Sequence, residues 1–143
     1  MFVGEFARSI DANGRVALPA KFGEKLDGEC YLRLDPRGAL AVTSAERYQQ
    51  EAETLSRRIE AGEADPDELE VLGATTTLVS IDKHGRVTLD AKALAHAGIR
   101  PGSEVMFVGS VFGFRIWRPS RFATVSAERA TAAPARVWED EDD

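Results

Sequence analysis

The strongest constraint on the fold of this 143-residue chain is an internal repeat. Residues 9–21 have the sequence SIDANGRVALPAK and residues 80–92 have the sequence SIDKHGRVTLDAK, so that nine of thirteen aligned positions are identical. A weaker similarity relates residues 30–42 to residues 105–117. Self-similarity of this kind indicates one structural unit that is used twice.

The repeat divides the chain into four segments. We expect a first unit, a helical connector, a second unit, and the end of a terminal helix that runs into a disordered tail. Their expected bounds are residues 1–48, 49–74, 75–123 and 124–143. The last segment finishes in five acidic residues, Glu139–Asp143, and an acidic tail is usually solvated.

Short strands are expected on both sides of each repeated loop, because β-forming residues flank it. They cover residues 7–10, 15–18, 76–81 and 86–89. Asn13-Gly14 between two such segments favours a two-residue hairpin with a type I′ turn, in which both residues take a positive φ. His84-Gly85 takes the same place in the second unit.

The remaining segments are expected to form helices and two further strand pairs. The strand pairs surround turns at residues 35–38 and 110–113. The expected helices cover residues 19–26, 44–61, 67–72, 90–97 and 120–130. Ser44, Asp90 and Ser120 stand where an N-cap is needed. Residues 44–61 carry apolar side chains at the spacing of one helix face.

Composition narrows the classes of function. No apolar run approaches the ~20 residues of a membrane helix. Glu5 and Arg8 interrupt the N-terminal segment, which argues against a signal peptide. Cys30 is the only cysteine, and with two histidines it makes a poor set of ligands for zinc. These features favour a cytoplasmic protein without a metal.

The net charge of −6 opposes nucleic-acid binding at first sight, because phosphate contacts need Lys and Arg. Much of the acidity is concentrated in residues 60–70 and 139–143, however. The charge of one face can therefore differ from the total. No GxSxG motif, glycine-rich phosphate loop or paired histidine and nucleophile is present in the sequence. We expect no enzyme activity, no cofactor and no small-molecule substrate.

The repeated loop carries the motif Asp-x-x-Gly-Arg twice, as Asp11, Gly14 and Arg15 and as Asp82, Gly85 and Arg86. The aspartate can accept hydrogen bonds from backbone amides and shape the loop, and the glycine supplies a positive φ. The arginine has a planar fork that fits phosphate and the O6/N7 edge of guanine. The alternative is that the arginine only forms a local salt bridge with the aspartate. The two roles are compatible if the aspartate shapes the loop while the arginine points outward.

Further residues are candidates for DNA contact or for structural roles. Asn13, Lys83 and His84 add hydrogen-bonding groups to the loops, and Arg8, Lys21 and Lys92 lie nearby in sequence. His84 either contacts DNA or only fills the turn. For Arg8, Lys21 and Lys92, DNA contact and a solvated surface position are equally open. Structural roles are expected for Cys30 and His96, and for Phe112, Phe114 and Trp117 as core or subunit interface.

These motifs together resemble the MraZ family over about residues 1–125. The segments that carry the resemblance are MFVGEF at residues 1–6, DANGRVALPAK at 11–21, DKHGRV at 82–87 and FRIW at 114–117. The resemblance implies an α+β, mainly β fold of two tandem AbrB-like, SpoVT-type swapped-hairpin units, which form an interlocked β-barrel with flanking helices. It also implies a ring-shaped homo-oligomer.

The resemblance further implies a sequence-specific DNA-binding transcription regulator associated with the nucleoid. Its partner is double-stranded promoter DNA with repeated short G-containing boxes, and it is expected to repress its own operon in the division and cell-wall gene cluster. Arg15 and Arg86 occupy the DNA-facing arginine positions. Ala12-Asn13 departs from the family pattern, in which a lysine commonly precedes the glycine, so the first loop is expected to contribute less charge. An antitoxin-like or scaffold module on the same barrel is the alternative.

Overall fold

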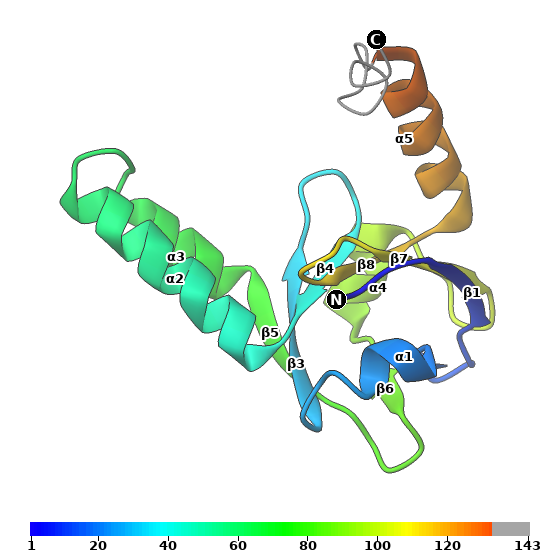
Figure 1. Ribbon diagram of the computed structural model, residues 1–143. Helices are drawn as coiled ribbons and strands as arrows, with labels where there is room; N and C mark the ends of the chain where they lie inside the picture. The colour runs from blue at the N-terminus through cyan, green and yellow to red at the C-terminus, as the bar shows by residue number, and fades with distance from the viewer. Residues whose placement is uncertain (133–143) are drawn as a thin grey trace, which may run out of the picture.

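A computed structural model of the chain describes residues 1–132 and gives eight strands and five helices within them. The strands are β1 (Glu5–Ser9), β2 (Arg15–Ala17), β3 (Glu29–Leu34), β4 (Leu40–Thr43), β5 (Thr76–Ser80), β6 (Arg86–Thr88), β7 (Glu104–Gly109) and β8 (Phe114–Trp117). The helices are α1 (Ala20–Gly23), α2 (Ala45–Glu60), α3 (Asp67–Ala74), α4 (Ala91–Ala97) and α5 (Pro119–Ala132). The expected α+β class is confirmed, with antiparallel sheets at the centre of the molecule (Figure 1).

The two repeats exchange strands. The larger sheet has the order β1-β7-β8-β4-β3-β5, so that β1 of the first repeat pairs with β7 of the second, and β5 of the second repeat pairs with β3 of the first. The smaller sheet pairs β2 with β6. The strands on either side of each repeated loop therefore find their partners in the other repeat, and between β1 and β2 only an isolated bridge from Ile10 to Val16 remains.

The closed β-barrel implied by the family resemblance is not formed by the strands of residues 1–132. The six-stranded sheet is open, with β1 and β5 at its edges, and the β2–β6 pair is a separate ribbon. The expected type I′ turns are also wrong. Gly14 and Gly85 have φ values of 81° and 76°, but neither Asn13 nor His84 takes a positive φ. A three-residue loop with glycine in the left-handed region accounts for this geometry.

One apolar core holds both repeats together. Its fully enclosed aromatic side chains are Phe22, Phe107 and Phe114, which come from both halves of the chain. The rings of Phe22 and Phe114 stack at a centroid distance of 4.8 Å. Burying a side chain of this kind stabilises a fold by about 1.5–3 kcal/mol. Because the rings of one repeat pack on those of the other, neither repeat completes this core alone.

Helix caps follow the sequence in two places and depart from it in others. The Ser44 side chain accepts a hydrogen bond from the Arg47 amide, and the Asp90 side chain accepts one from the Ala93 amide, which confirms both as N-caps. Helix α5 begins at Pro119, so the prediction of Ser120 as its cap is wrong. Helix α1 is shorter than expected and ends at Gly23.

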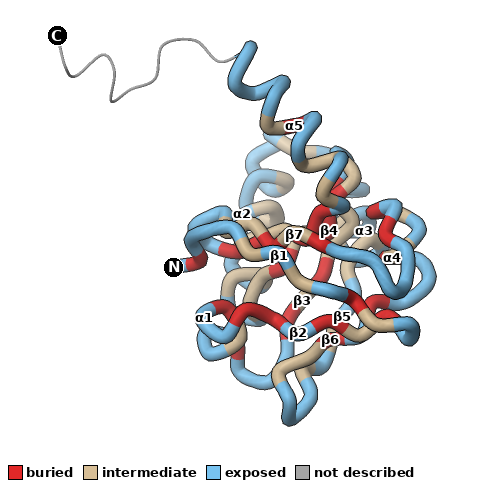
Figure 2. The backbone as a smooth tube through the Cα atoms, turned by 90° about the vertical axis from the view of Figure 1, so that its right-hand side faces the viewer, coloured by how far each residue is buried: buried red, intermediate tan, exposed pale blue. Residues whose placement is uncertain are grey.

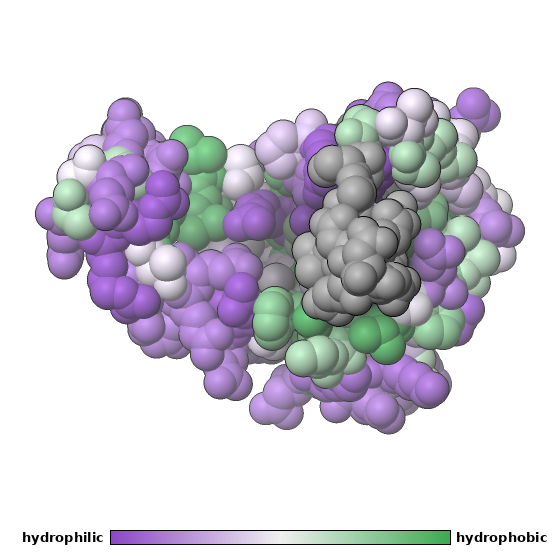
Figure 3. All heavy atoms as spheres, turned by 45° about the horizontal axis from the view of Figure 1, so that its top comes forward, coloured by the Kyte–Doolittle hydropathy of each residue, from purple (hydrophilic) through white to green (hydrophobic). Residues whose placement is uncertain are grey.

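Helices α2 and α3 lie side by side as an arm that extends away from the sheets, and α5 projects from another part of the molecule (Figure 1). The surface of the α2–α3 arm is mainly hydrophilic (Figure 3). The expected acidic tail, Glu139–Asp143, lies outside the described residues. None of the described helices is both long enough and apolar enough to cross a membrane.

A buried carboxylate links the two repeats. Asp35, in the β3–β4 turn, is 7% exposed, and its Oδ2 accepts a hydrogen bond of 3.0 Å from Arg115 Nε in β8. His96 Nε2 lies 2.6 Å from the Asp35 carbonyl oxygen, which gives that histidine a structural role. Burial alone raises the pKa of Asp35, but hydrogen bonds from Arg37 and Arg115 outweigh it and hold the pKa below 3.8.

Candidate nucleic-acid interface

The first repeated loop is organised by the Asp11 carboxylate. Oδ1 accepts hydrogen bonds of 2.8 Å from the amides of Asn13 and Arg15. Oδ2 accepts one of 2.9 Å from Arg15 Nε. The loop closes through the amide of Gly14, which donates to the Asp11 carbonyl oxygen at 3.1 Å. The aspartate therefore shapes the loop and also holds its arginine.

The second loop repeats this arrangement bond for bond. Asp82 Oδ1 accepts from the amides of His84 and Arg86 at 2.8 Å and 3.0 Å, and Oδ2 accepts from Arg86 Nε at 3.1 Å. The hydrogen bonds from the Arg15 and Arg86 amides are the main reason that the pKa values of Asp11 and Asp82 lie below the ordinary value of 3.8. Both carboxylates are thus ionised at neutral pH.

Only the Nε atom of each arginine is used by its aspartate. The terminal Nη atoms of Arg15 and Arg86 make no hydrogen bond within residues 1–132, and the two side chains are 40% and 35% exposed. The local salt bridge and the outward-pointing arginine, which the sequence left as alternatives, therefore occur together. The bond to Nε orients each guanidinium group, and the N–H groups of its two Nη atoms are available to a ligand.

The β2–β6 ribbon places both arginines on one face. Arg15 pairs with Thr88, and Arg86 pairs with Ala17. Directly paired residues of an antiparallel ladder project to the same side, so these four side chains share one face and Val16 and Val87 form the other. Val16 and Val87 are 1% and 3% exposed, which fixes the opposite face as the solvent side. We shall call the face with Arg15, Ala17, Arg86 and Thr88 the arginine face.

The two arginines are diagonal neighbours on the arginine face, and such positions lie about 7–8 Å apart between Cα atoms. Each loop is also tied to the other repeat. The Leu18 amide donates to the Gly85 carbonyl oxygen at 3.0 Å, and the Leu89 amide donates to the Gly14 carbonyl oxygen at 2.8 Å. The ribbon and both loops are therefore one connected unit.

The other predicted contact residues are divided between two places. Asn13, Lys83 and His84 lie exposed in the loops at the two ends of the ribbon. Figure 2 shows the loop below β6 in the colour of exposed residues. Arg8 lies instead in β1, where its guanidinium donates to the Ala7 carbonyl oxygen and lies 5.7 Å from the centre of the Phe6 ring. The structure does not bring Arg8 onto the arginine face.

Two structural expectations have different outcomes. Cys30 is buried, and burial raises the pKa of its thiol to about 11, so it is a small apolar core residue. Phe114 and Trp117 are enclosed as expected, but Phe112 lies in the β7–β8 turn and is 58% exposed. No group of three metal-ligating side chains occurs within the described part of the chain.

Sequence reasoning missed the link through Asp35. Its position in an Asp-Pro-Arg-Gly turn predicts a local role, and nothing in the sequence places Arg115 beside it. The weaker repeat aligns the β3–β4 turn with the β7–β8 turn. It gives no sign of this link, because the turn of the second repeat has no carboxylate.

Comparison with known proteins gives a consistent result. A family model described as "MraZ protein, putative antitoxin-like" matches residues 72–139. A transcriptional regulator MraZ of Beijerinckia indica is 37% identical over 86% of this chain and 77% of its own length. That of Thermomicrobium roseum is 30% identical over 94% of both chains, and that of Azorhizobium caulinodans is 35% identical over 89% of this chain and 83% of its own. On these similarities and the paired Asp-x-x-Gly-Arg loops, the chain belongs to the MraZ family.

Proposed function

We propose that this protein is a transcription regulator that binds double-stranded DNA through the arginine face. A two-stranded β-ribbon is one of the elements that fit the major groove of DNA. The outer edges of Arg15 and Arg86 carry paired N–H donors, which match the O6 and N7 acceptors of guanine. The relatives named as transcriptional regulators support this function.

The spacing of the arginines supports reading of short G-containing boxes. Two arginines whose Cα atoms lie about 7–8 Å apart span roughly two base-pair steps of about 3.4 Å each. The anchoring of Nε by Asp11 and Asp82 reduces the rotamer entropy that each arginine loses on binding. Lys83, His84 and Asn13, at the ends of the ribbon, contact the flanking phosphates and set the register.

Oligomerisation completes the proposal. One arginine face offers two base contacts and few phosphate contacts, which is too little for tight binding in the presence of salt. A ring of identical subunits that engages successive boxes raises the avidity by about 100-fold or more through effective concentration. Bound to repeats in its own promoter, on the nucleoid in the cytoplasm, the protein would repress its operon in the division and cell-wall gene cluster.

The observation that carries the proposal is the anchored but outward-facing pair of arginines on one ribbon face. The test is a gel-shift titration of Arg15→Ala with Arg86→Ala against promoter DNA that carries the boxes. We expect the double variant to lose about 100-fold or more in affinity for the boxes, because each guanine contact contributes about 1–3 kcal/mol. Arg57→Ala removes an exposed arginine from α2 and serves as the control. Wild-type affinity in the double variant would refute the proposed interface.

The antitoxin-like description of the family model keeps a protein-binding module as a second candidate. The two candidates differ in their response to salt. DNA binding predicts that log K falls linearly with log salt concentration, with a slope of about −0.9 for each phosphate contacted. Either a flat dependence or the absence of binding to DNA with and without the boxes would favour the second candidate.

A further inference from the structure

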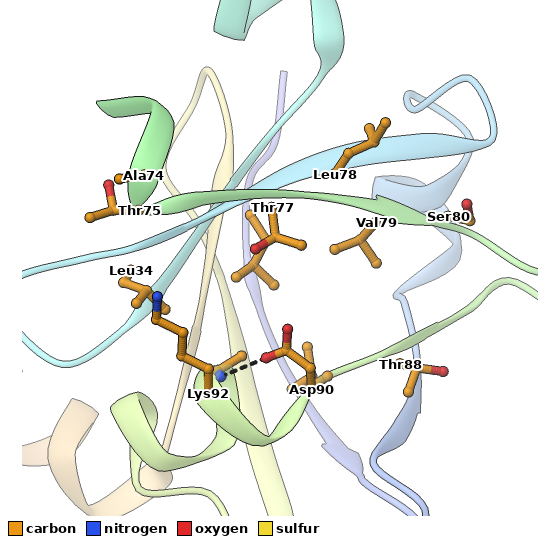
Figure 4. Close-up of a pocket in the computed structure, with 13 residues that line it drawn as sticks. Leu34, Ala74, Thr75, Thr77, Leu78, Val79, Ser80, Thr88, Asp90 and Lys92 are labelled. Carbon is orange, nitrogen blue, oxygen red and sulfur yellow. Dashed lines mark hydrogen bonds between the residues drawn. The ribbon is translucent and has the colours of Figure 1, made fainter. Parts of the chain in front are cut away.

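Two further features of the described surface differ in their charge. The first is an open apolar groove of about 300 Å³ between β5, β3 and α4 (Figure 4). Its counterpart in the first repeat is filled by the Phe6 and Phe22 rings, which pack edge-on at a centroid distance of 5.4 Å. Asp90 and Lys92 both line the groove, so its charges balance and it selects no charged partner.

The second feature is a group of arginines where α5 meets the β3–β4 turn. Arg121 Nε donates to the Arg37 carbonyl oxygen at 3.1 Å, and Arg37 and Arg115 share the carboxylate of Asp35. Arg129 lies about two turns further along the same side of α5. Partial desolvation and the positive charges of Arg37 and Arg115 lower its pKa below the ordinary value. We shall call Arg37, Arg115, Arg121 and Arg129 the α5 arginine cluster.

The positive charge of this cluster exceeds what the described chain neutralises. Asp35 supplies one carboxylate to four guanidinium groups. Glu128 is the only acidic residue of α5, and it is exposed. Within residues 1–132, neither Arg121 nor Arg129 forms a salt bridge. The cluster therefore fits a partner that carries several negative charges.

Apolar side chains border the cluster. The Arg37 guanidinium lies 6.0 Å from the centre of the Trp117 ring, and the Phe122 ring lies 6.0 Å from the same ring. Trp117 is enclosed, whereas Phe122 is only partly buried. The surface at the base of α5 thus offers an apolar part beside a basic part.

The sequence that follows α5 carries the complementary groups in one short segment. Residues 133–143 have the sequence APARVWEDEDD, in which the apolar pair Val137-Trp138 directly precedes the five carboxylates of the acidic tail, Glu139–Asp143. Arg136 is the only cation among these residues. An apolar pair followed by carboxylates matches an apolar surface followed by guanidinium groups.

The acidic tail is within reach of the cluster of its own chain. An extended chain spans about 3.3 Å per residue, so Glu139 can lie up to about 23 Å from Ala132, and Asp143 up to about 36 Å. Helix α5 rises only about 16 Å between Arg121 and Ala132. The segment can therefore return along α5 to the cluster, and its covalent attachment gives it a high effective concentration there.

The place of the cluster favours this occupant over DNA held by the arginine face. Helix α5 and the β2–β6 ribbon lie at opposite ends of the molecule in both backbone views (Figures 1 and 2). A duplex on the ribbon therefore does not meet the cluster of the same chain.

We propose that the acidic tail, Glu139–Asp143, binds the α5 arginine cluster of its own chain, with Val137-Trp138 against Phe122. The contact neutralises a second basic surface and leaves the arginine face as the surface offered to DNA. This inference goes beyond the proposed function and does not depend on it, because the contact forms without DNA.

Trp138 is the probe for the contact, because Trp117, the other tryptophan, is 1% exposed. Acrylamide quenching of tryptophan fluorescence is measured on the full chain, on the tail variant E139Q/D140N/E141Q/D142N/D143N and on the cluster variant R121Q/R129Q. We expect both variants to raise the quenching constant about twofold or more, because each breaks a network of exposed ion pairs. Salt at about 1 M, where the Debye length is about 3 Å, is expected to do the same to the wild type.

R57Q/R58Q is the matched control, because it removes two exposed arginines from α2, in the arm that extends away from the sheets. It is expected to be quenched as the wild type is. Tail and cluster variants combined are expected to add nothing to either one, because both break the same contact. Additive effects, or wild-type quenching in the tail variant, would overturn the inference.

Folding of each variant is checked by circular dichroism. The tail variant leaves residues 1–132 unchanged, so its result stands whatever the cluster variant does. If R121Q/R129Q unfolds through loss of the bond to the Arg37 carbonyl oxygen, R129Q alone keeps that bond and is expected to raise quenching in the same direction.

A disulfide distinguishes the cluster of the same chain from that of a neighbouring copy. Ser126→Cys places a thiol in α5 and Glu141→Cys places one in the acidic tail, while Cys30 is buried and stays out of exchange. On non-reducing gels we expect a bond within one chain, formed more slowly when Arg129→Gln is added. Covalent dimers would place the tail on another copy and contradict the proposal.

Double-stranded DNA without the boxes tests the other occupant. With the tail intact, R121Q/R129Q is expected to bind this DNA as the wild type does at the same salt concentration, because the tail already covers the cluster. Weaker binding by R121Q/R129Q would show that the cluster contacts phosphates and would overturn the inference. The result for the arginine face is separate, because it comes from box-containing DNA and the Arg15→Ala with Arg86→Ala variant.

Discussion

The two repeated loops have the same hydrogen bonds but different surroundings. A Cβ atom added to Gly14 would lie 2.8 Å from the Leu89 carbonyl oxygen, whereas one added to Gly85 would meet nothing within 4 Å. The first loop is therefore packed against the other repeat, and the second loop stands open to solvent. The comparison teaches that two loops with the same local hydrogen bonds, each also bonded to the other repeat, can differ in how closely the glycine is packed.

The two residues between the aspartate and the glycine also differ between the loops. The packed first loop has Ala12 and Asn13, and the open second loop has Lys83 and His84. All four of these residues are exposed, but only the second loop has a cation among them, Lys83, that can contact a phosphate. We infer that the two arginines contribute alike to base contacts, and that the second loop contributes more to phosphate contacts.

The largest expected difference between the loops is in stability. Gly14→Ala places a side chain at a φ of 81° and against a backbone oxygen, so we expect the free energy of unfolding to fall by about 2–4 kcal/mol. Gly85→Ala carries only the cost of the left-handed backbone, about 1–2 kcal/mol. Urea unfolding of both variants measures the difference. Equal losses would show that the packing of the first loop is unimportant.

The next effect concerns the arginines one at a time. Arg15→Ala and Arg86→Ala remove equivalent side chains from one face, so each is expected to weaken binding to box-containing DNA by about 1–3 kcal/mol. Titrations with single-box DNA at constant salt measure both. Losses that differ by more than about tenfold would mean that the two loops do not contact DNA alike.

A smaller effect is expected from the charge difference between the loops. Lys83→Ala removes a phosphate contact and is expected to make the slope of log K against log salt shallower by about 0.9. Ala12→Lys places a lysine at the equivalent position of the first loop and is expected to steepen the slope by a similar amount. An unchanged slope in Lys83→Ala would remove the basis for unequal phosphate contact.

The smallest expected effect is in the titration of the loop carboxylates. Asp11 and Asp82 have pKa values below 3.8, chiefly because backbone amides of Arg15 and Arg86 donate to them. The ionised carboxylates therefore stabilise the loops at any pH above 3.8, and this contribution is lost as the pH falls through the lowered folded-state pKa. Carbon-13 NMR titration of both residues is expected to give depressed and similar values; an ordinary value at either position would mean that its loop is not formed in solution.

Much of the local structure could be predicted from the sequence. Ser44 and Asp90 cap their helices as expected, because an N-cap depends on the residue itself and on amides two or three positions away. The Asp-x-x-Gly-Arg loops and the burial of Cys30 follow from similarly short-range patterns. Prediction failed for the turn type, because the φ of Asn13 depends on the three-residue loop that Asp11 closes.

Long-range features do not follow from local sequence patterns, and swapped hairpins were expected only through the family resemblance. Nothing local indicates that β1 leaves its own loop partner to pair with β7, or that Arg115 lies beside Asp35. The placement of Phe112 on the same strand as Phe114 was wrong for a related reason, because the strand begins only at Phe114. Its exposure excludes the core and leaves the predicted role at a subunit interface open.

The sequence by itself determined the repeat, the two aspartate-shaped loops and the family of the protein, because these depend on residue identity at fixed short spacings. Tertiary structure decided that both arginines share one face, since that requires β2 and β6 to pair across the repeats. It also decided that one repeat fills its groove with aromatic rings while the other leaves it open, because volume is matched only where distant segments meet.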